Sequence, residues 1–246
     1  MNESIRESLI DLNNDFYSNF ADSFSATRGR LQPGVLSITA DIPADAYILD
    51  LGCGNGQFLF NLGRSRFRGS YIGLDFSPGL LENARALNQS LHNIIFSFLQ
   101  ADLTRPSWNE QFSPASFDVI TSFATLHHIP GSDLHLQILH QAHDLLKPDG
   151  LFIFSVWQFI NSRRLVDRIL PWETIGLTDQ DVDPGDYLLD WRAEVGENQV
   201  GKRYVHLFDE SALEKLRLAT GFELQQSFYS DGKEGNLALY QTWIKT

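Results

Sequence analysis

The chain has 246 residues, of which 19 are basic and 31 acidic, and its formal net charge at pH 7 is −12. This length predicts one domain, or one domain with an insertion. Such a chain buries enough surface to be stable without disulfide bonds or structural metal ions. The charge has the wrong sign for a protein that holds nucleic acid by bulk attraction alone. The single cysteine, Cys53, excludes a disulfide framework and a cysteine metal site.

The start of the chain, MNESIRESLIDLNNDF, lacks the basic and apolar regions of a secretion signal. No apolar run in the sequence is long enough to span a bilayer. We therefore expect a cytoplasmic protein that has no membrane partner.

The first 46 residues are interpreted as a helical lid. Apolar residues occur at roughly helical spacing, which predicts an amphipathic helix: Ile5, Leu9, Leu12 and Phe16. Aromatic and hydroxyl side chains follow, ending in Arg28 and Arg30. Such a segment ahead of a ligand site could cover the ligand or contact an acceptor. The alternative is an ordinary surface helix with a linker.

Residues 47–56, YILDLGCGNG, are the most informative stretch. A short apolar run ends in Asp50, and a turn containing Gly52, Gly54 and Gly56 follows, which predicts a buried strand, a tight turn and a helix. Glycine adopts positive φ without a Cβ penalty and lets a ligand lie against bare backbone. The amides that open the helix then face that ligand.

Two classes of nucleotide-type ligand use such a turn. The dinucleotide fingerprint G-x-G-x-x-G would need its third glycine at position 57, which is Gln57. Asp50, just before the loop, suits a cation better than a diphosphate. The stretch resembles the first motif of the class I S-adenosylmethionine (SAM) dependent methyltransferases, whose ligand carries an ammonium and a sulfonium. An NAD-dependent oxidoreductase is the alternative.

This resemblance implies an α/β fold: a doubly wound, mostly parallel seven-stranded sheet, Rossmann-like, with an antiparallel final strand. Residues 47–157 would form the SAM-binding core, with S-adenosylhomocysteine as the product. The cofactor-binding residues that we expect from these motifs lie at or after strand ends: Asp50, Gly52, Cys53, Gly54, Gly56, Asp75, Phe76, Asp102, Leu103, Ser122 and Phe123.

Two further acids follow predicted strands. The strand 70–75 ends in Asp75, whose carboxylate can accept hydrogen bonds from both ribose hydroxyls. Dinucleotide enzymes also place an acid there. Asp102 follows the strand 94–99. The resemblance implies that Asp102 accepts from the adenine amino group while the Leu103 amide contacts a ring nitrogen. A plain turn acid is the alternative for Asp102.

The segment 123–130 should border the reacting methyl group. It leaves the carboxyl end of the strand 117–122. The first and fourth strands of such a sheet flank the point where the strand order reverses, and ligands bind there. His127 or His128 would serve as the base for a phenol or amine acceptor. A hydrogen-bonded histidine that braces the loop is the alternative for each.

The second half of the chain completes the expected fold. A helix from about 132 precedes a central strand, 151–157, and its histidines His135, His140 and His143 are interpreted as solvated rather than as metal ligands. Residues 158–202 read as an irregular insertion that caps the acceptor site. Residues 203–246 would complete the sheet, with a helix and a closing antiparallel pair.

Several stretches resemble one family in particular, the tRNA wobble-uridine methyltransferases, which esterify 5-carboxymethyluridine. The matching pieces are Phe24–Arg28, LDLGCGNG, His127–His128, Val156–Trp157, Gly185–Trp191 and Arg203–Phe208. Two residues depart from the pattern of that family. Val205 stands where the family usually has a second tyrosine, and Asp190 stands where it tends to have a proline. The acidic net charge is also unhelpful for binding tRNA.

A carboxylate acceptor is ionised at neutral pH and needs a fork-shaped donor rather than a base, and Arg28 or Arg203 could supply it. The expected catalytic residues are thus Arg28, His127, His128 and Arg203. The acceptor would be tRNA or a small carboxylate, and a tRNA enzyme could need a small activating protein partner. One basic cluster could contact tRNA: Arg163, Arg164, Arg168, Lys202 and Arg203. A small-molecule O- or carboxyl methyltransferase and an inactive SAM-binding partner subunit are the alternatives.

Overall fold

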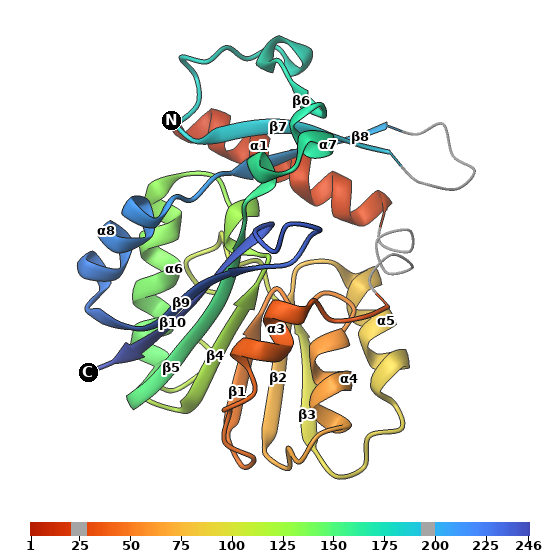
Figure 1. The fold of residues 1–246 in the computed structure, drawn as a ribbon, viewed down its shortest axis with the longest axis vertical. Coiled ribbons are helices and arrows are strands. Elements are labelled where there is room, and N and C mark those ends of the chain that lie inside the picture. Colours follow the sequence, from red (N-terminus) through yellow and green to blue (C-terminus); the bar gives the residue numbers. More distant parts are fainter. Residues whose placement is uncertain (21–28, 193–199) are drawn as a thin grey trace.

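The computed structural model describes residues 1–20, 29–192 and 200–246. Its centre is a seven-stranded sheet with the strand order β3-β2-β1-β4-β5-β10-β9 (Figure 1). The strands are β1 (Tyr47–Leu51), β2 (Ser70–Asp75), β3 (Ile95–Gln100), β4 (Phe117–Phe123), β5 (Leu146–Trp157), β9 (Phe222–Ser230) and β10 (Ala238–Lys245). Strands β1 to β5 pair in parallel, and β10 runs antiparallel to both of its neighbours. The predicted fold class is confirmed.

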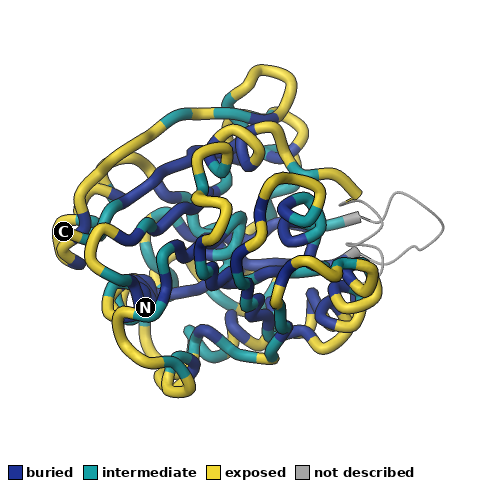
Figure 2. The backbone as a smooth tube through the Cα atoms, turned by 90° about the horizontal axis from the view of Figure 1, so that it is seen from below, coloured by how far each residue is buried: buried dark blue, intermediate teal, exposed yellow. Residues whose placement is uncertain are grey.

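Helices cover both faces of this sheet. The helices α3 (Pro33–Ile38), α4 (Gln57–Gly63) and α5 (Pro78–Asn88) contribute apolar side chains to the core on one face. The helices α6 (Ser132–Leu145) and α8 (Glu210–Thr220) contribute to the core on the other. Figure 2 shows the buried stretches running through the middle of the molecule, with exposed loops around them.

The order in which strands are added to the sheet reverses between β1 and β4. Strand β1 pairs with β2 on one side and with β4 on the other. The chain therefore builds outward from β1 in one direction and returns to build from β4 in the other. Loops that leave the carboxyl ends of β1 and β4 diverge to opposite faces, which opens a crevice for a ligand.

A second layer lies over this crevice (Figure 1). It contains a three-stranded antiparallel sheet of β6 (Ile169–Leu170), β7 (Asp186–Arg192) and β8 (Val200–His206), with the short helices η2 (Phe159–Asn161), α7 (Arg163–Val166) and η3 (Trp172–Ile175). Helix α1 (Glu3–Asn19) packs on this sheet, where Leu9 joins Trp172, Leu188 and Tyr204 in one apolar cluster. The expected boundary between residues 202 and 203 falls inside β8.

The side chain of Asn13 ties the layers together. Its Nδ2 donates to the backbone oxygens of His128, at 2.7 Å, and Tyr204, at 3.2 Å, and its Oδ1 accepts from the Tyr204 amide at 2.8 Å. We expect Asn13→Leu to lower the free energy of unfolding by about 3 kcal/mol, because buried backbone groups lose their partners. Urea denaturation measures this. Asn19→Leu, at an exposed position of the same helix, is the control, and an equal loss in both variants would contradict the role of Asn13.

Candidate functional site

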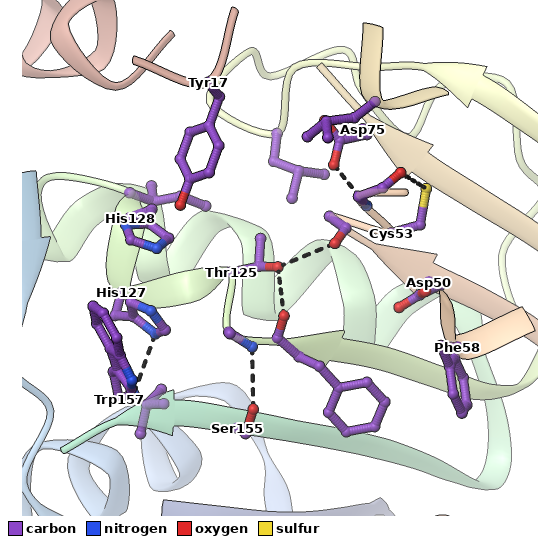
Figure 3. Close-up of a pocket in the computed structure, with 18 of the residues that line it drawn as sticks. Tyr17, Asp50, Cys53, Phe58, Asp75, Thr125, His127, His128, Ser155 and Trp157 are labelled. Atoms are coloured by element: carbon purple, nitrogen blue, oxygen red, sulfur yellow. Dashed lines mark hydrogen bonds between the residues drawn. The ribbon is translucent and has the colours of Figure 1, made fainter. Parts of the chain in front are cut away.

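A cavity of about 430 Å³ opens at the carboxyl ends of β1 and β4 (Figure 3). Its wall includes parts of α1, the glycine turn after β1, the ends of β2 and β3, the loop after β4, the end of β5, β8 and the β9–β10 hairpin. This volume is in the range of cavities that hold small-molecule cofactors. The crevice predicted from the strand order is thus a real cavity.

The glycine turn presents bare backbone to this cavity. Gly52 and Gly54 have φ of +75° and +54°, and both lie on the wall. A Cβ on Gly52 would lie 2.2 Å from Oγ1 of Thr125, whereas one on Gly54 would meet nothing within 4 Å. The turn therefore leaves a space at Gly54 in which a ligand can approach the main chain.

Gly56 has a different position from the other two glycines. It does not line the cavity. It caps α4 with φ of +73°, and a Cβ there would lie 2.9 Å from the Cβ of Ala84 and 2.7 Å from Nδ2 of Asn88, both on α5. Its absent side chain therefore permits α4 and α5 to pack closely.

Asp50 and Asp75 bring two buried carboxyl groups to the cavity. Asp50 accepts hydrogen bonds from the hydroxyl groups of Tyr71, at 2.6 Å, and Thr121, at 2.7 Å. Asp75 accepts from the backbone amides of Gly54 and Ser77, both at 2.9 Å. The second acid therefore connects the glycine turn to the turn after β2.

Burial raises the pKa of Asp50 from its ordinary value of 3.8 to about 6, and hydrogen bonds from Tyr71 and Thr121 offset part of that effect. The pKa of Asp75 also rises to about 6 through burial, opposed by the backbone amides of Ser77, Gly54 and Phe76. Both groups are ionised at neutral pH. Two buried negative charges beside bare backbone fit a cationic nucleoside such as SAM.

The pH dependence of cofactor binding should report these two acids. Because a cation favours the ionised carboxylates, we expect the affinity for SAM to fall by about 10- to 100-fold between pH 7.5 and pH 5. Calorimetry across this range measures the change. An affinity that is constant over the range would show that neither charge takes part.

The stability of the free protein should show the opposite trend. A carboxyl group whose folded pKa is raised contributes stability that is full below its unfolded pKa, near 3.8, and that is lost as the pH rises through about 6. Thermal unfolding without the cofactor should therefore show this contribution declining from pH 4 to pH 6. The increase in melting temperature on adding SAM should grow over the same interval.

The other residues expected to bind the cofactor are divided between the wall and the core. Cys53, Phe76, Asp102, Leu103 and Phe123 line the cavity. Oδ1 of Asp102 accepts from both the amide, at 2.9 Å, and the hydroxyl, at 2.6 Å, of Thr104, which orients the carboxyl group. Ser122 is fully buried in β4 and is not on the wall.

His127 and His128 line the far side of the cavity in different tautomers. Nδ1 of His127 accepts from the backbone N–H of Trp157 at 3.3 Å, so that its ring proton lies on Nε2. Nδ1 of His128 lies 3.3 Å from the Tyr204 oxygen, which only accepts, so that Nδ1 carries the proton. The first histidine is a donor at Nε2 and the second is an acceptor there.

Arg203 reaches the same side of the cavity from β8 and is 4% exposed. Its guanidinium carbon lies 4.6 Å from the ring centre of Trp157 and 5.5 Å from that of Phe16. Such cation–π contacts hold the planar group in place. Arg28 lies outside the described residues.

Arg203 does not share a surface with Lys202, another residue of the expected basic cluster. Arg203 is buried toward the cavity, whereas the preceding residue, Lys202, donates to the Thr174 oxygen outside it. Successive side chains of a strand point to opposite faces, which separates these two neighbours. Arg163 is paired with Asp167 at 2.9 Å.

Several cavity residues were not assigned to the site from sequence: Asn13, Asn14, Tyr17, Ser155, Asp231 and Tyr240. Asn13 and Tyr17 are four residues apart on α1, which is a helical repeat that could have indicated a shared face. Asp231 reads as part of a hairpin turn, but its carboxyl group accepts from the Gly34 amide at 3.0 Å and the Tyr240 hydroxyl at 2.6 Å. No local signal reveals these two contacts.

His135 is buried rather than solvated. Its Nε2 lies 2.7 Å from the Ile129 oxygen, and burial lowers its pKa to about 4. Within residues 1–20, 29–192 and 200–246, no group of three or more histidine, cysteine or acidic side chains is arranged to hold a metal ion. No helix in these same ranges is both long and apolar enough to cross a bilayer.

Comparison with known proteins identifies one family and several relatives. Residues 24–227 match a family model described as a methyltransferase domain. A tRNA (carboxymethyluridine(34)-5-O)-methyltransferase of Arabidopsis thaliana is 30% identical over 141 residues, 57% of this chain and 31% of the relative. The protein-lysine N-methyltransferase EFM4 of Saccharomyces cerevisiae is 28% identical over 148 residues, 54% of this chain and 62% of the relative. The chain therefore spans less than two thirds of either relative.

A solved structure shares the fold. It is a methyltransferase in complex with the Trm112 methyltransferase activator of Haloferax volcanii, with a TM-score of 0.64 and 17% identity, covering 94% of this chain and 96% of that one.

Proposed function

Because the chain belongs to the methyltransferase domain family and uses SAM as its cofactor, we propose that it transfers a methyl group to a carboxylate oxygen of an acceptor held by Arg203. The prediction of a SAM-dependent methyltransferase is confirmed by the family match.

The observation that carries the proposal is the buried guanidinium of Arg203 at the cavity wall. Held between Trp157 and Phe16, it loses little conformational freedom when it binds. A guanidinium presents two parallel N–H groups that match the two oxygens of a carboxylate. A cation in this position favours an anionic acceptor.

The two histidines support the same chemistry. The Nε2–H of His127 is a second donor for an acceptor oxygen, and Nδ1–H of His128 donates to the Tyr204 oxygen, which fixes the orientation of that ring. A carboxylate, with a pKa of about 4, is already ionised and requires no base. When bound, SAM supplies a methyl group on sulfur, and its carbon–sulfur bond breaks as the oxygen–carbon bond forms, with the bonding pair passing to sulfur. The residues of this chain need only orient the acceptor and exclude water.

We infer that the carboxylate belongs to a modified wobble uridine of tRNA. The relative from Arabidopsis thaliana, named for carboxymethyluridine at position 34, supports this substrate. A net charge of −12 argues that such an enzyme would bind tRNA with a partner protein. The fold neighbour in complex with a methyltransferase activator supports a small activating partner.

The second candidate is a small carboxylic acid as acceptor. The acidic net charge favours it, because a small substrate needs no extended basic surface. An amine or phenol acceptor would use His128 as its base, since Nε2 is the acceptor nitrogen of that ring.

A screen for methyl transfer tests these proposals. Transfer RNA that carries 5-carboxymethyluridine, unmodified tRNA as its control, and a set of small carboxylic acids are incubated with the protein and SAM, with and without an activating partner. Mass spectrometry should find one added methyl group in a product that mild alkali hydrolyses, because esters are cleaved and ethers or methylamines are not. An alkali-stable product would contradict a carboxylate acceptor.

A further inference from the structure

Tyr17 occupies a place in the cavity that the motifs do not account for. It lies on α1, is 8% exposed and lines the cavity. Its ring centre is 6.0 Å from that of Phe76 and 5.4 Å from that of His128, with the ring planes nearly perpendicular in both pairs. In Figure 3 the side chain enters the cavity with its hydroxyl end beside His128.

The two neighbours of Tyr17 mark different parts of the cofactor site. Phe76 directly follows Asp75, where the ribose is expected, and His128 borders the acceptor side, toward which the methyl group must point. In SAM, the sulfur is bonded both to the carbon attached to the ribose ring and to the methyl group. A ring that contacts residues at both of these positions would lie near the sulfur of a bound SAM.

We propose that the ring of Tyr17 contacts the sulfonium of SAM and makes the site favour SAM over S-adenosylhomocysteine. The face of an aromatic ring attracts a cation. Methyl transfer removes the positive charge from sulfur, so that this attraction is lost in the product. The ammonium group, which Asp50 is expected to attract, is the same in both molecules and does not separate them.

The ring is held in position before any ligand binds. Tyr17 packs edge-on against Phe16 at 5.0 Å, and both belong to an apolar cluster with Phe20 and Leu80. Its backbone lies one helical turn from Asn13, whose side chain is bonded to the His128 and Tyr204 backbone. A preorganised ring loses little freedom on binding and can therefore contribute to selectivity.

This inference rests on the cofactor alone and does not depend on which acceptor is methylated. Calorimetry with SAM and with S-adenosylhomocysteine tests it on three proteins: the native protein, Tyr17→Phe and Tyr17→Leu. We expect Tyr17→Phe to keep the ratio of the two dissociation constants within about twofold. Tyr17→Leu should weaken SAM about five- to tenfold and S-adenosylhomocysteine less than about twofold.

An equal loss of affinity for both ligands in Tyr17→Leu, or no loss for either, would overturn the proposal. Tyr229→Leu, on an exposed part of β9, is the matched control and should leave the ratio unchanged. If Tyr17→Leu fails to fold, replacement of Tyr17 by pentafluorophenylalanine keeps the size of the ring and reverses its polarity. The preference for SAM should then fall relative to Tyr17→Phe, and an unchanged preference would equally overturn the proposal.

The same titrations separate this inference from the proposals above. Absence of SAM binding to the native protein would contradict the cofactor site itself. If Tyr17→Leu loses its preference for SAM over S-adenosylhomocysteine as expected, and Arg203→Gln keeps full turnover, the role of Tyr17 stands. Only the carboxylate acceptor is then contradicted.

Discussion

Asp75→Ala is expected to weaken the binding of SAM by about 100-fold or more. The variant removes a carboxylate that would accept two hydrogen bonds from the ribose hydroxyls. It also removes the acceptor of the Gly54 and Ser77 amides, which hold the two turns of the cavity together. Calorimetry measures the affinity directly, without need of the acceptor.

Two further variants make this experiment specific. Asp75→Asn keeps one acceptor oxygen without the charge and should fall between the native protein and the alanine variant. Asp118→Ala removes a partly exposed acid of β4 that accepts from Lys147 and the Tyr47 amide at the opposite end of the sheet. It should lower stability and leave the affinity for SAM within about twofold. An unchanged affinity in Asp75→Ala would remove the assignment of the ribose acid.

Arg203→Gln is expected to reduce turnover by about 100-fold or more while the affinity for SAM changes less than about threefold. The glutamine keeps much of the packing against Trp157 but loses the charge and the fork of donors. Arg203→Lys keeps the charge without the fork and should recover only part of the activity. Initial rates with the acceptor found in the screen, together with calorimetry for SAM, separate the two effects.

Arg28→Ala belongs in the same series, because either arginine could hold a carboxylate. Lys202→Gln is the matched control, since Lys202 neighbours Arg203 in the chain and donates to the Thr174 oxygen outside the cavity. Its turnover should stay within about twofold of the native rate. If neither Arg28→Ala nor Arg203→Gln loses turnover, the carboxylate acceptor should be abandoned.

The core of the fold could be predicted because its signals are local. The strand before Asp50, the three glycines and the alternation of apolar runs with helical patterns each depend on residues close in sequence. Asp50, near the end of β1, and Asp75, at the end of β2, follow from the same register, and both lie at the cavity. Ser122 and Phe123 show the limit of this approach, because one residue of shift on β4 exchanges a core position for a wall position.

The second layer could not be predicted because its contacts join distant segments. Asn13 and Tyr204 are separated by 191 residues, yet one side chain bonds the backbone of the other. Strand β6 has only two residues, too few for a periodic pattern. The residues 158–202 therefore read as irregular, although most of the cap is organised around a small sheet that packs on α1.

Local sequence alone was sufficient to identify the cofactor class, because the acid and the glycine turn expected to bind the cofactor lie within the ten residues 47–56. The acceptor side was decided only when the chain folded. Arg203 was a candidate among several basic residues until β8 turned it inward between Trp157 and Phe16, and Tyr17 had no motif at all. Successive side chains of a strand point to opposite faces, and side chains on one side of a helix face the element that packs there. Which residues they contact is therefore set by tertiary packing.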